Sequence, residues 1–151
     1  MPTHLLATPH RPQEEEAGCL AACAQMILLH LGIRQTQVFL NRLLGLTSIG
    51  TPFSNIRRLG QIDVTVSLQA GTAADLCGAI DRGQPSIVFL LTGDLPYWLD
   101  NTAHAVVVVG YDEETVFLND PQFDDAPKRV RWDNFMLSWS EQDYTYAFIM
   151  R

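Results

Sequence analysis

The chain has 151 residues, 47% of them hydrophobic, and a formal net charge of -7 at pH 7. This length and apolar content are typical of one domain with its own core and exclude an intrinsically disordered protein. Because nucleic acids and anionic membranes attract basic surfaces, the negative charge argues against both as the main partner. A neutral or basic substrate fits the charge better.

The cysteines and the N-terminal residues indicate the compartment. The chain has three cysteines, Cys19, Cys23 and Cys77, an odd number at uneven spacing. This pattern is not typical of a disulfide framework, and it favours a protein of a reducing compartment. The first residues lack the basic and apolar segments of a signal peptide. Apolar runs such as Ile87–Leu91 and Ala105–Val109 are far shorter than the roughly 20 residues that cross a bilayer. We therefore expect a soluble, cytoplasmic protein.

The first half of the chain is predicted to be helical. Residues 1–12 hold three prolines and predict an extended N-terminal arm. Residues 19–31 predict a helix that is apolar almost all round and therefore buried. A second helix is expected over 36–44, between a threonine cap and a glycine stop. A third is expected to start with Thr51 as its cap, with a proline at its first position, and to end near Gly60.

The second half reads mostly as strands. Strands are predicted at 64–68, 85–91, 103–109, 115–119 and 144–150, and helices at 72–82 and 132–139. The strands on either side of the turn at 110–114 form a hairpin, and a polar loop follows over 120–128. This order predicts an α+β fold with an N-terminal helical half packed on a mostly antiparallel C-terminal sheet. With no internal repeat and no long linker, residues 1–151 are expected to form a single domain.

Cys19 stands at the start of the buried helix. The free N–H groups and the dipole of a helix N-terminus favour a thiolate, which is the nucleophilic form of cysteine. Cys23 lies one turn later on the same helix, and Cys77 falls in the middle of another predicted helix, as a small core residue would. Cys19 is therefore the candidate nucleophile, and a buried hydrophobic role is its alternative.

His104 and Asp120 are placed together by the predicted hairpin. If the turn centres on residues 112–113, His104 faces Asp120 or Gln122, and side chains that oppose each other across a ladder share one face. An aspartate there can fix the histidine tautomer, as in a catalytic triad. Asn119 falls on the opposite face unless a bulge intervenes. The alternatives are a capping or surface histidine and an aspartate that serves only the turn.

The segment before Cys19 offers groups that bear on acyl transfer. Gln13 can donate a side-chain amide to a developing oxyanion, and the Cys19 backbone N–H can donate a second hydrogen bond. If the run Glu14–Glu16 faces the thiol, its negative charge disfavours the thiolate. Otherwise the run faces solvent or binds a basic part of the substrate. The pair Tyr97-Trp98 either lines a cleft or covers the edge of the core.

Two segments of the chain resemble a known family. The run from Gln13 to Met26 resembles the catalytic-cysteine region of the bacteriocin-processing peptidases, and the runs 102–112 and 116–121 resemble their histidine and aspartate region. Those papain-like domains trim double-glycine leader peptides, often as the N-terminal part of a peptide-exporting ABC transporter. The resemblance spans about residues 13–150. The chain departs from it at the nucleophile, where the family commonly has Asp-Cys-Gly and this sequence has a glycine before Cys19 and Leu20 after it.

The resemblance implies a papain-like cysteine peptidase fold and a role for each candidate. Cys19 carries over as nucleophile, His104 as base, Asp120 as the orienting acid and Gln13 as the oxyanion-hole residue. These are the roles that the residues themselves suggest. The expected function is hydrolysis of an amide bond in a peptide or protein substrate, through a thioester and without a cofactor.

Other functions fit the same residues. A papain-like fold also serves amidases, deamidases and acyltransferases, because a fold does not determine a reaction. A peptide-binding module that keeps the cleft and loses the activity is a further alternative, although such modules generally lack the cysteine or the histidine. A metal site is not expected, because the cysteines and histidines show no paired ligand spacing beyond Cys19 and Cys23.

Overall fold

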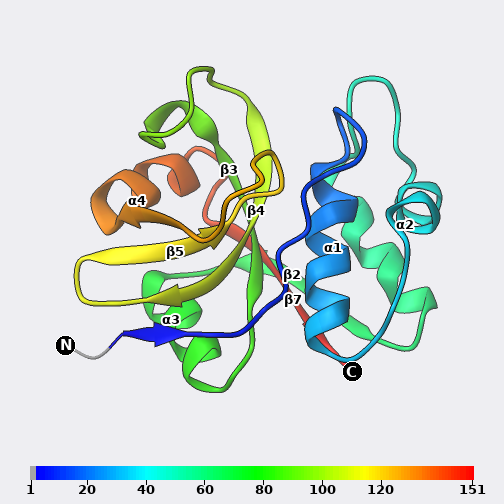
Figure 1. Cartoon of the computed structure of the whole chain (residues 1–151), viewed down its shortest axis with the longest axis horizontal. Coiled ribbons are helices and arrows are strands. Elements are labelled where there is room, and N and C mark those ends of the chain that lie inside the picture. Colours follow the sequence, from blue (N-terminus) through cyan, green and yellow to red (C-terminus); the bar gives the residue numbers. More distant parts are fainter. Residues whose placement is uncertain (1–2) are drawn as a thin grey trace.

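The structure, a computed structural model, describes residues 3–151 and has a helical part beside a sheet (Figure 1). Its helices are α1 (Cys19–His30), α2 (Gln37–Leu44), α3 (Ala73–Asp81) and α4 (Trp132–Ser140), with 3-10 helices η1 (Phe53–Gln61) and η2 (Thr92–Asp94). Its strands are β1 (His4–Leu5), β2 (Thr65–Ala70), β3 (Ser86–Leu91), β4 (Ala103–Tyr111), β5 (Thr115–Asn119), β6 (Lys128–Arg131) and β7 (Thr145–Met150).

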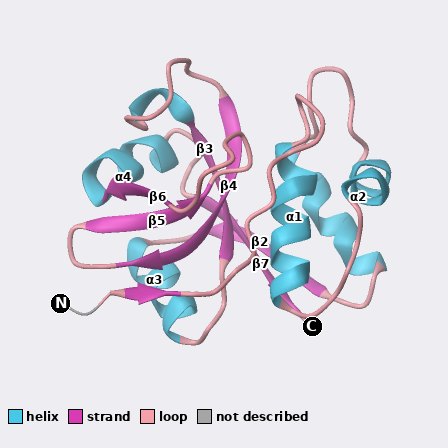
Figure 2. Ribbon diagram, viewed as in Figure 1, coloured by secondary structure: helices cyan, strands magenta, loops and turns pink. Residues whose placement is uncertain are grey.

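Within the described residues, all seven strands join one antiparallel sheet (Figure 2). The strand order is β2-β7-β3-β4-β5-β6, and β1 pairs with the end of β4 that β3 does not reach. A Cβ at Gly110 would overlap the carbonyl oxygen of His4 and the ring of Phe117, so glycine lets β1 approach β4 closely. Gly110 also lies at the end of a register shift in the β4–β5 ladder.

The predicted strands are all present, and two further strands were not predicted. β1 has two residues, which is too short for a recognisable pattern. β6 reads Lys-Arg-Val-Arg, and only Val130 is buried. It forms an edge of the sheet, where Lys and Arg side chains discourage pairing with another chain. Because three of its four residues are charged, a hydrophobicity pattern does not reveal this strand.

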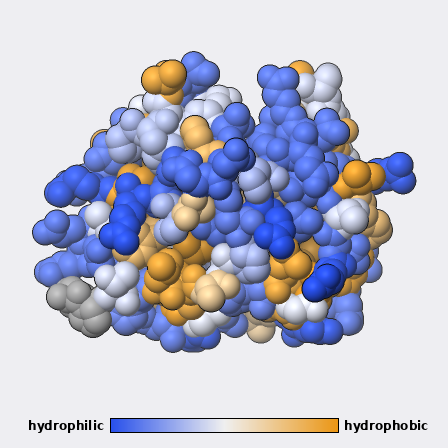
Figure 3. Space-filling model, viewed as in Figure 1, coloured by the Kyte–Doolittle hydropathy of each residue, from blue (hydrophilic) through white to orange (hydrophobic). Residues whose placement is uncertain are grey.

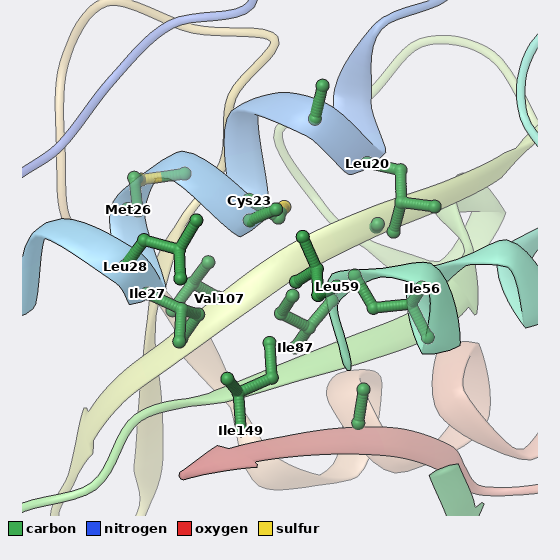
Figure 4. Packing of buried hydrophobic residues seen from close by; sticks show 14 of the residues in the cluster. Leu20, Cys23, Met26, Ile27, Leu28, Ile56, Leu59, Ile87, Val107 and Ile149 are labelled. Atoms are coloured by element: carbon green, nitrogen blue, oxygen red, sulfur yellow. The ribbon is translucent and has the colours of Figure 1, made fainter. Parts of the chain in front are cut away.

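Helix α1 packs against one face of the sheet. Its Cys23 and Ile27 meet Ile87 of β3 and Val107 of β4, and Leu59 of η1 closes the same cluster (Figure 4). All five side chains are at most 2% exposed. Burial of one isoleucine or leucine side chain contributes about 1.5–3 kcal/mol to folding. The cluster therefore fixes α1, and with it the position of Cys19, relative to β4.

Helices α3 and α4 cover the opposite face of the sheet. Leu76 of α3 and Phe135 and Trp139 of α4 pack against Val88 and Val106 of the central strands. β3 and β4 are buried on both faces, which is why residues 86–91 and 103–109 read as nearly continuous apolar runs rather than as alternating ones. No helix among residues 3–151 is long and apolar enough to span a bilayer.

Most helix ends follow the sequence signals, and one does not. Thr36 caps α2 by accepting a hydrogen bond from the Phe39 amide, and Thr72 forms a capping box at the start of α3. The third helix was expected to have Thr51 as its cap, which is wrong. Pro52 has extended backbone angles (φ -55°, ψ 131°) and is itself the residue before the helix, which winds as a 3-10 helix from Phe53.

Candidate active site

Cys19 is the first residue of α1, where the helix opens onto a cleft. The preceding residue, Gly18, makes no side-chain cap, so the first N–H groups of the helix are not consumed by a capping side chain. Cys19 is partly exposed, whereas Leu20 is 1% exposed and packs in the core. The bulky residue that departs from the family sequence therefore points away from the cleft.

The other two cysteines have different surroundings. Burial raises the pKa of Cys23 well above its ordinary value, and the nearby charges of Cys19 and Asp120 raise it further. Burial and then the charge of Asp81 raise the pKa of Cys77 to about 11. Both thiols are thus held in the protonated, unreactive form near neutral pH.

His104 lies near the start of β4 and is 4% exposed. Its Nε2 forms a 2.7 Å hydrogen bond with Oδ1 of Asp120. The β4–β5 ladder pairs Val107 with Asn119, so Asp120 lies just beyond the ladder on the face of His104. The predicted contact between His104 and Asp120 is therefore present. Asn119 turns the other way and donates its side-chain amide to the carbonyl oxygen of Thr8 (3.2 Å).

Asp120 is completely buried and accepts hydrogen bonds on both oxygens. Oδ1 accepts from His104 and from the Gln122 amide (3.0 Å). Oδ2 accepts from the Tyr97 hydroxyl (2.7 Å) and from the Trp98 indole N–H (2.9 Å). Burial alone would raise the pKa of Asp120, but these hydrogen bonds and the charge of His104 outweigh it and lower the pKa. The carboxylate is therefore ionised although it is buried.

The surroundings of His104 favour its protonated form. Burial alone would lower the pKa of His104, but the hydrogen bond with Asp120, the nearby Cys19 thiol and the charges of both raise it to about 9. Asp120 is hydrogen-bonded to Nε2 of His104. The other ring nitrogen, Nδ1, therefore remains for the interaction with Cys19. An imidazolium between a carboxylate and a thiol is the arrangement in which a cysteine is used as a nucleophile.

Gln13 lies beside this group. Its backbone N–H donates to the carbonyl oxygen of Pro121 (2.7 Å), which ties the N-terminal arm to the loop after Asp120. Its side-chain Nε2 donates to the carbonyl oxygens of Glu15 (3.1 Å) and Glu16 (2.6 Å). Both hydrogens of the amide are thus engaged by the backbone. Gln13 is at the cleft, but its amide is not free in this structure.

The cleft has a volume of about 580 Å³ and opens between the helical part and the sheet. The molecular surface is notched between these two parts (Figure 3). Cys19, His104 and Gln13 line the cleft, and Phe53 and Trp98 supply aromatic walls. The sequence left open whether Tyr97 and Trp98 line a cleft or cover the core. Trp98 lines the cleft, and Tyr97 packs partly buried against the core behind it.

Comparison with known proteins identifies the family. Residues 5–147 match the Peptidase_C39 like family. The chain belongs to this family. It is accordingly a cysteine-type peptidase, and the predicted membership in the bacteriocin-processing peptidases is confirmed. No curated protein matches the chain.

Solved structures show the same fold in other members. A protein from Bacillus anthracis described as a C39-like peptidase has a TM-score of 0.80 at 17% identity, over 100% of this chain and 98% of that one. The peptidase domain of Streptococcus ComA, a bifunctional ABC transporter of a quorum-sensing pathway, has a TM-score of 0.78 at 19% identity, over 95% and 98%. A double-glycine-motif protease from an AMS/PCAT transporter, in complex with its leader peptide, has a TM-score of 0.75 at 15% identity, over 97% and 93%. The predicted papain-like α+β fold is confirmed.

The sequence did not assign the partners of Asp120 other than His104. Tyr97, Trp98 and the Gln122 amide complete its shell. The available signal was an adjacent pair of aromatic residues with polar heads, a few positions before His104. A buried tyrosine hydroxyl or indole N–H requires an acceptor, and a buried aspartate requires donors.

Proposed function

We propose that Cys19, His104 and Asp120 form a catalytic triad that hydrolyses an amide bond in a peptide or protein. The observation that supports this most is the position of His104, which is bonded to the buried carboxylate of Asp120 at 2.7 Å and is adjacent to the partly exposed thiol of Cys19. Nucleophile, base and orienting acid then line or directly adjoin one cleft.

The proposed reaction proceeds in two steps. The Cys19 thiolate attacks the scissile carbonyl carbon, and the His104 imidazolium gives its proton to the leaving amine, which leaves a thioester on the sulfur. His104 then takes a proton from water, and the resulting hydroxide displaces the thiolate and releases the carboxylic acid. The Cys19 backbone N–H and the Gln13 side-chain amide donate hydrogen bonds to the oxyanion. To do so, Gln13 breaks one of the two hydrogen bonds that its amide donates to backbone carbonyl oxygens and forms one to the oxyanion instead.

The substrate class follows from the cleft and from the family. The proposed substrate is an extended peptide that crosses the cleft between Phe53 and Trp98. The AMS/PCAT protease binds a leader peptide on the same fold. The three cysteines are all free, which fits the proposal that the protein works in the reducing cytoplasm.

A peptide library analysed by mass spectrometry tests this function. The expected result is new peptide termini, which mark backbone cleavage. Conversion of a side-chain amide to an acid without cleavage would instead identify a deamidase. Products joined to an added amine would identify an acyltransferase, and tight peptide binding without any product would identify a binding module.

Alkylation by iodoacetamide tests the assignment of the nucleophile. Near neutral pH we expect Cys19 to be labelled well before Cys77, because Cys77 has its pKa raised to about 11 and is therefore protonated. Cys23 is 0% exposed and is expected to stay unlabelled in the folded protein. Peptide mapping after timed quenching gives the three rates. Equal, slow labelling of Cys19 and Cys77 would contradict the triad.

The pH dependence of peptide hydrolysis tests the role of His104. The proposed active form carries a protonated His104. Because its pKa is raised, His104 stays protonated at every pH below the raised value and loses its proton as the pH rises above it. We therefore expect kcat/KM to decline as the pH rises through about 9, the pKa of His104 in the fold. A decline centred near 6.5, the ordinary value for histidine, would show that Asp120 and Cys19 do not hold the proton on His104.

A further inference from the structure

The two oxygens of Asp120 have different partners. Oδ1 holds the His104 ring and the Gln122 amide, whereas Oδ2 is bound only by side chains, the Tyr97 hydroxyl at 2.7 Å and the Trp98 indole N–H at 2.9 Å. Asp120 is 0% exposed, so water does not compensate for a missing donor. The four donors therefore fix both the rotation of the carboxylate and the distribution of its charge.

Tyr97 and Trp98 are themselves held rigidly. The ring of Phe123 meets the Tyr97 ring edge-on at 5.3 Å and the Trp98 ring edge-on at 5.5 Å. The Lys128 ammonium lies 5.2 Å from the centre of the Tyr97 ring. Both donors come from the segment between η2 and β4, directly before His104. Histidine and the donors to its carboxylate thus belong to one short stretch of chain.

The chemistry of a shared carboxylate gives these donors a function. A hydrogen bond donated to Oδ2 withdraws negative charge from Oδ1, and the charge on Oδ1 determines how strongly the carboxylate holds a protonated imidazole. Two neutral donors on Oδ2 therefore moderate the bond from His104 to Asp120. Without them the imidazolium would be held more firmly and would give its proton to a leaving amine less readily.

We propose that Tyr97 and Trp98 are positioning residues, which orient Asp120 and limit how strongly it holds the proton of His104. This inference rests on the proposed triad, in which His104 must both keep and release that proton. Tyr97 does not line the cleft, so its effect on the reaction passes entirely through Asp120. Trp98 lines the cleft as well and has a second surface available to the substrate.

The test is an NMR titration of the His104 ring in the full chain and in the variants Tyr97→Phe and Trp98→Phe. Each variant keeps an aromatic ring and removes one donor to Oδ2, while the other donor preserves the orientation of Asp120. The expected result is a rise in the pKa of His104 by about half a unit in each variant. Loss of one neutral hydrogen bond changes the pKa of a carboxylate by about one unit, and a part of this change is transmitted to the pKa of the histidine.

The chain offers matched control variants. Tyr146→Phe removes a partly buried hydroxyl that accepts a hydrogen bond from Gln69 (3.0 Å), and Trp132→Phe removes an indole N–H that donates to the carbonyl oxygen of Asp112 (3.1 Å). Neither residue contacts the triad, so the titration of His104 is expected to be unchanged in both. An unchanged or lowered pKa of His104 in Tyr97→Phe and Trp98→Phe would overturn the inference.

A measurement on the unsubstituted protein covers the case in which a variant does not fold. The Trp98 ring meets the His104 ring edge-on at 4.8 Å, so the readout is taken at Tyr97, which donates to Asp120. As His104 loses its proton, charge returns to Asp120, and the ring resonances of Tyr97 are expected to shift with the same midpoint, whereas those of Tyr146 are not. The absence of this shift would also overturn the inference. Neither readout requires turnover, so a protein that shows both shifts and cleaves no peptide would refute the proposed function alone.

Discussion

Replacement of Cys19 by alanine is expected to abolish peptide hydrolysis, with kcat/KM lower by about 10⁴-fold or more. Among residues 3–151, Cys19 is the one cysteine that lines the cleft, so alanine there removes the sulfur on which the thioester would form. The fold should be retained, because Cys19 is partly exposed and α1 is held by the core residues that follow it. Steady-state kinetics on a substrate peptide identified in the library measures the loss of activity, and circular dichroism of the variant measures retention of the fold.

Two comparisons make this result decisive. Cys77→Ser changes a half-buried thiol on α3, remote from the cleft, and should leave kcat/KM unchanged. Binding of the peptide to Cys19→Ala should persist, since the cleft keeps its walls. Retention of most of the activity in Cys19→Ala would remove the thiol from the mechanism, and the peptidase would then need a different nucleophile.

Asp120→Asn is expected to reduce kcat by about 10⁴-fold and also to destabilise the protein. Asp120 accepts four hydrogen bonds on two oxygens, but asparagine offers one acceptor oxygen and an NH₂ group. Whichever way the amide turns, its NH₂ group faces two donors: either His104 and the Gln122 amide, or Tyr97 and Trp98. Buried donors left without an acceptor cost about 1–3 kcal/mol each, and the tautomer of His104 is no longer fixed.

Asp112→Asn is the matched control. Asp112 receives its hydrogen bonds, from the Glu114 and Thr115 amides and from the Thr115 hydroxyl, on Oδ1 alone. An asparagine oxygen can accept all of these, so urea denaturation and kinetics should change little. If Asp120→Asn were as active and as stable as Asp112→Asn, Asp120 would be an ordinary turn residue and the triad would be wrong.

The site could be predicted from the sequence to the extent that local rules determine it. The start of α1 places Cys19, and the period of two along a hairpin places His104 and Asp120 on one face. The register shift between Val108 and Gly110 lies between the turn and the site, because Tyr111 pairs with Val116 on the turn side and Val107 pairs with Asn119 on the side of His104. It moves the alternation by one residue, which brings Asp120 onto the face of His104. The contact between α1 and β4 joins residues far apart in sequence, and the resemblance to the family was needed to expect it.

The parts that the sequence did not predict depend on distant contacts. Tyr97 and Trp98 lie in a loop, and no periodicity relates a loop to the aspartate that it will contact. The amide of Gln13 donates to the backbone of its own segment, which depends on how residues 13–16 turn before α1. β1 can be identified as a strand from its pairing with β4 and not from its own sequence.

The place of β7 in the sheet has a consequence for the newly made protein. β7 is the last strand in chain order, yet it lies between β2 and β3, and Ala147 pairs with both Leu68 and Ile87. A ribosome releases Cys19 early and β7 late, so β2 has no neighbouring strand and the face that supports α1 stays incomplete until synthesis of this region ends. The late strand β7 thus completes the sheet on which α1, with Cys19 at its start, is packed.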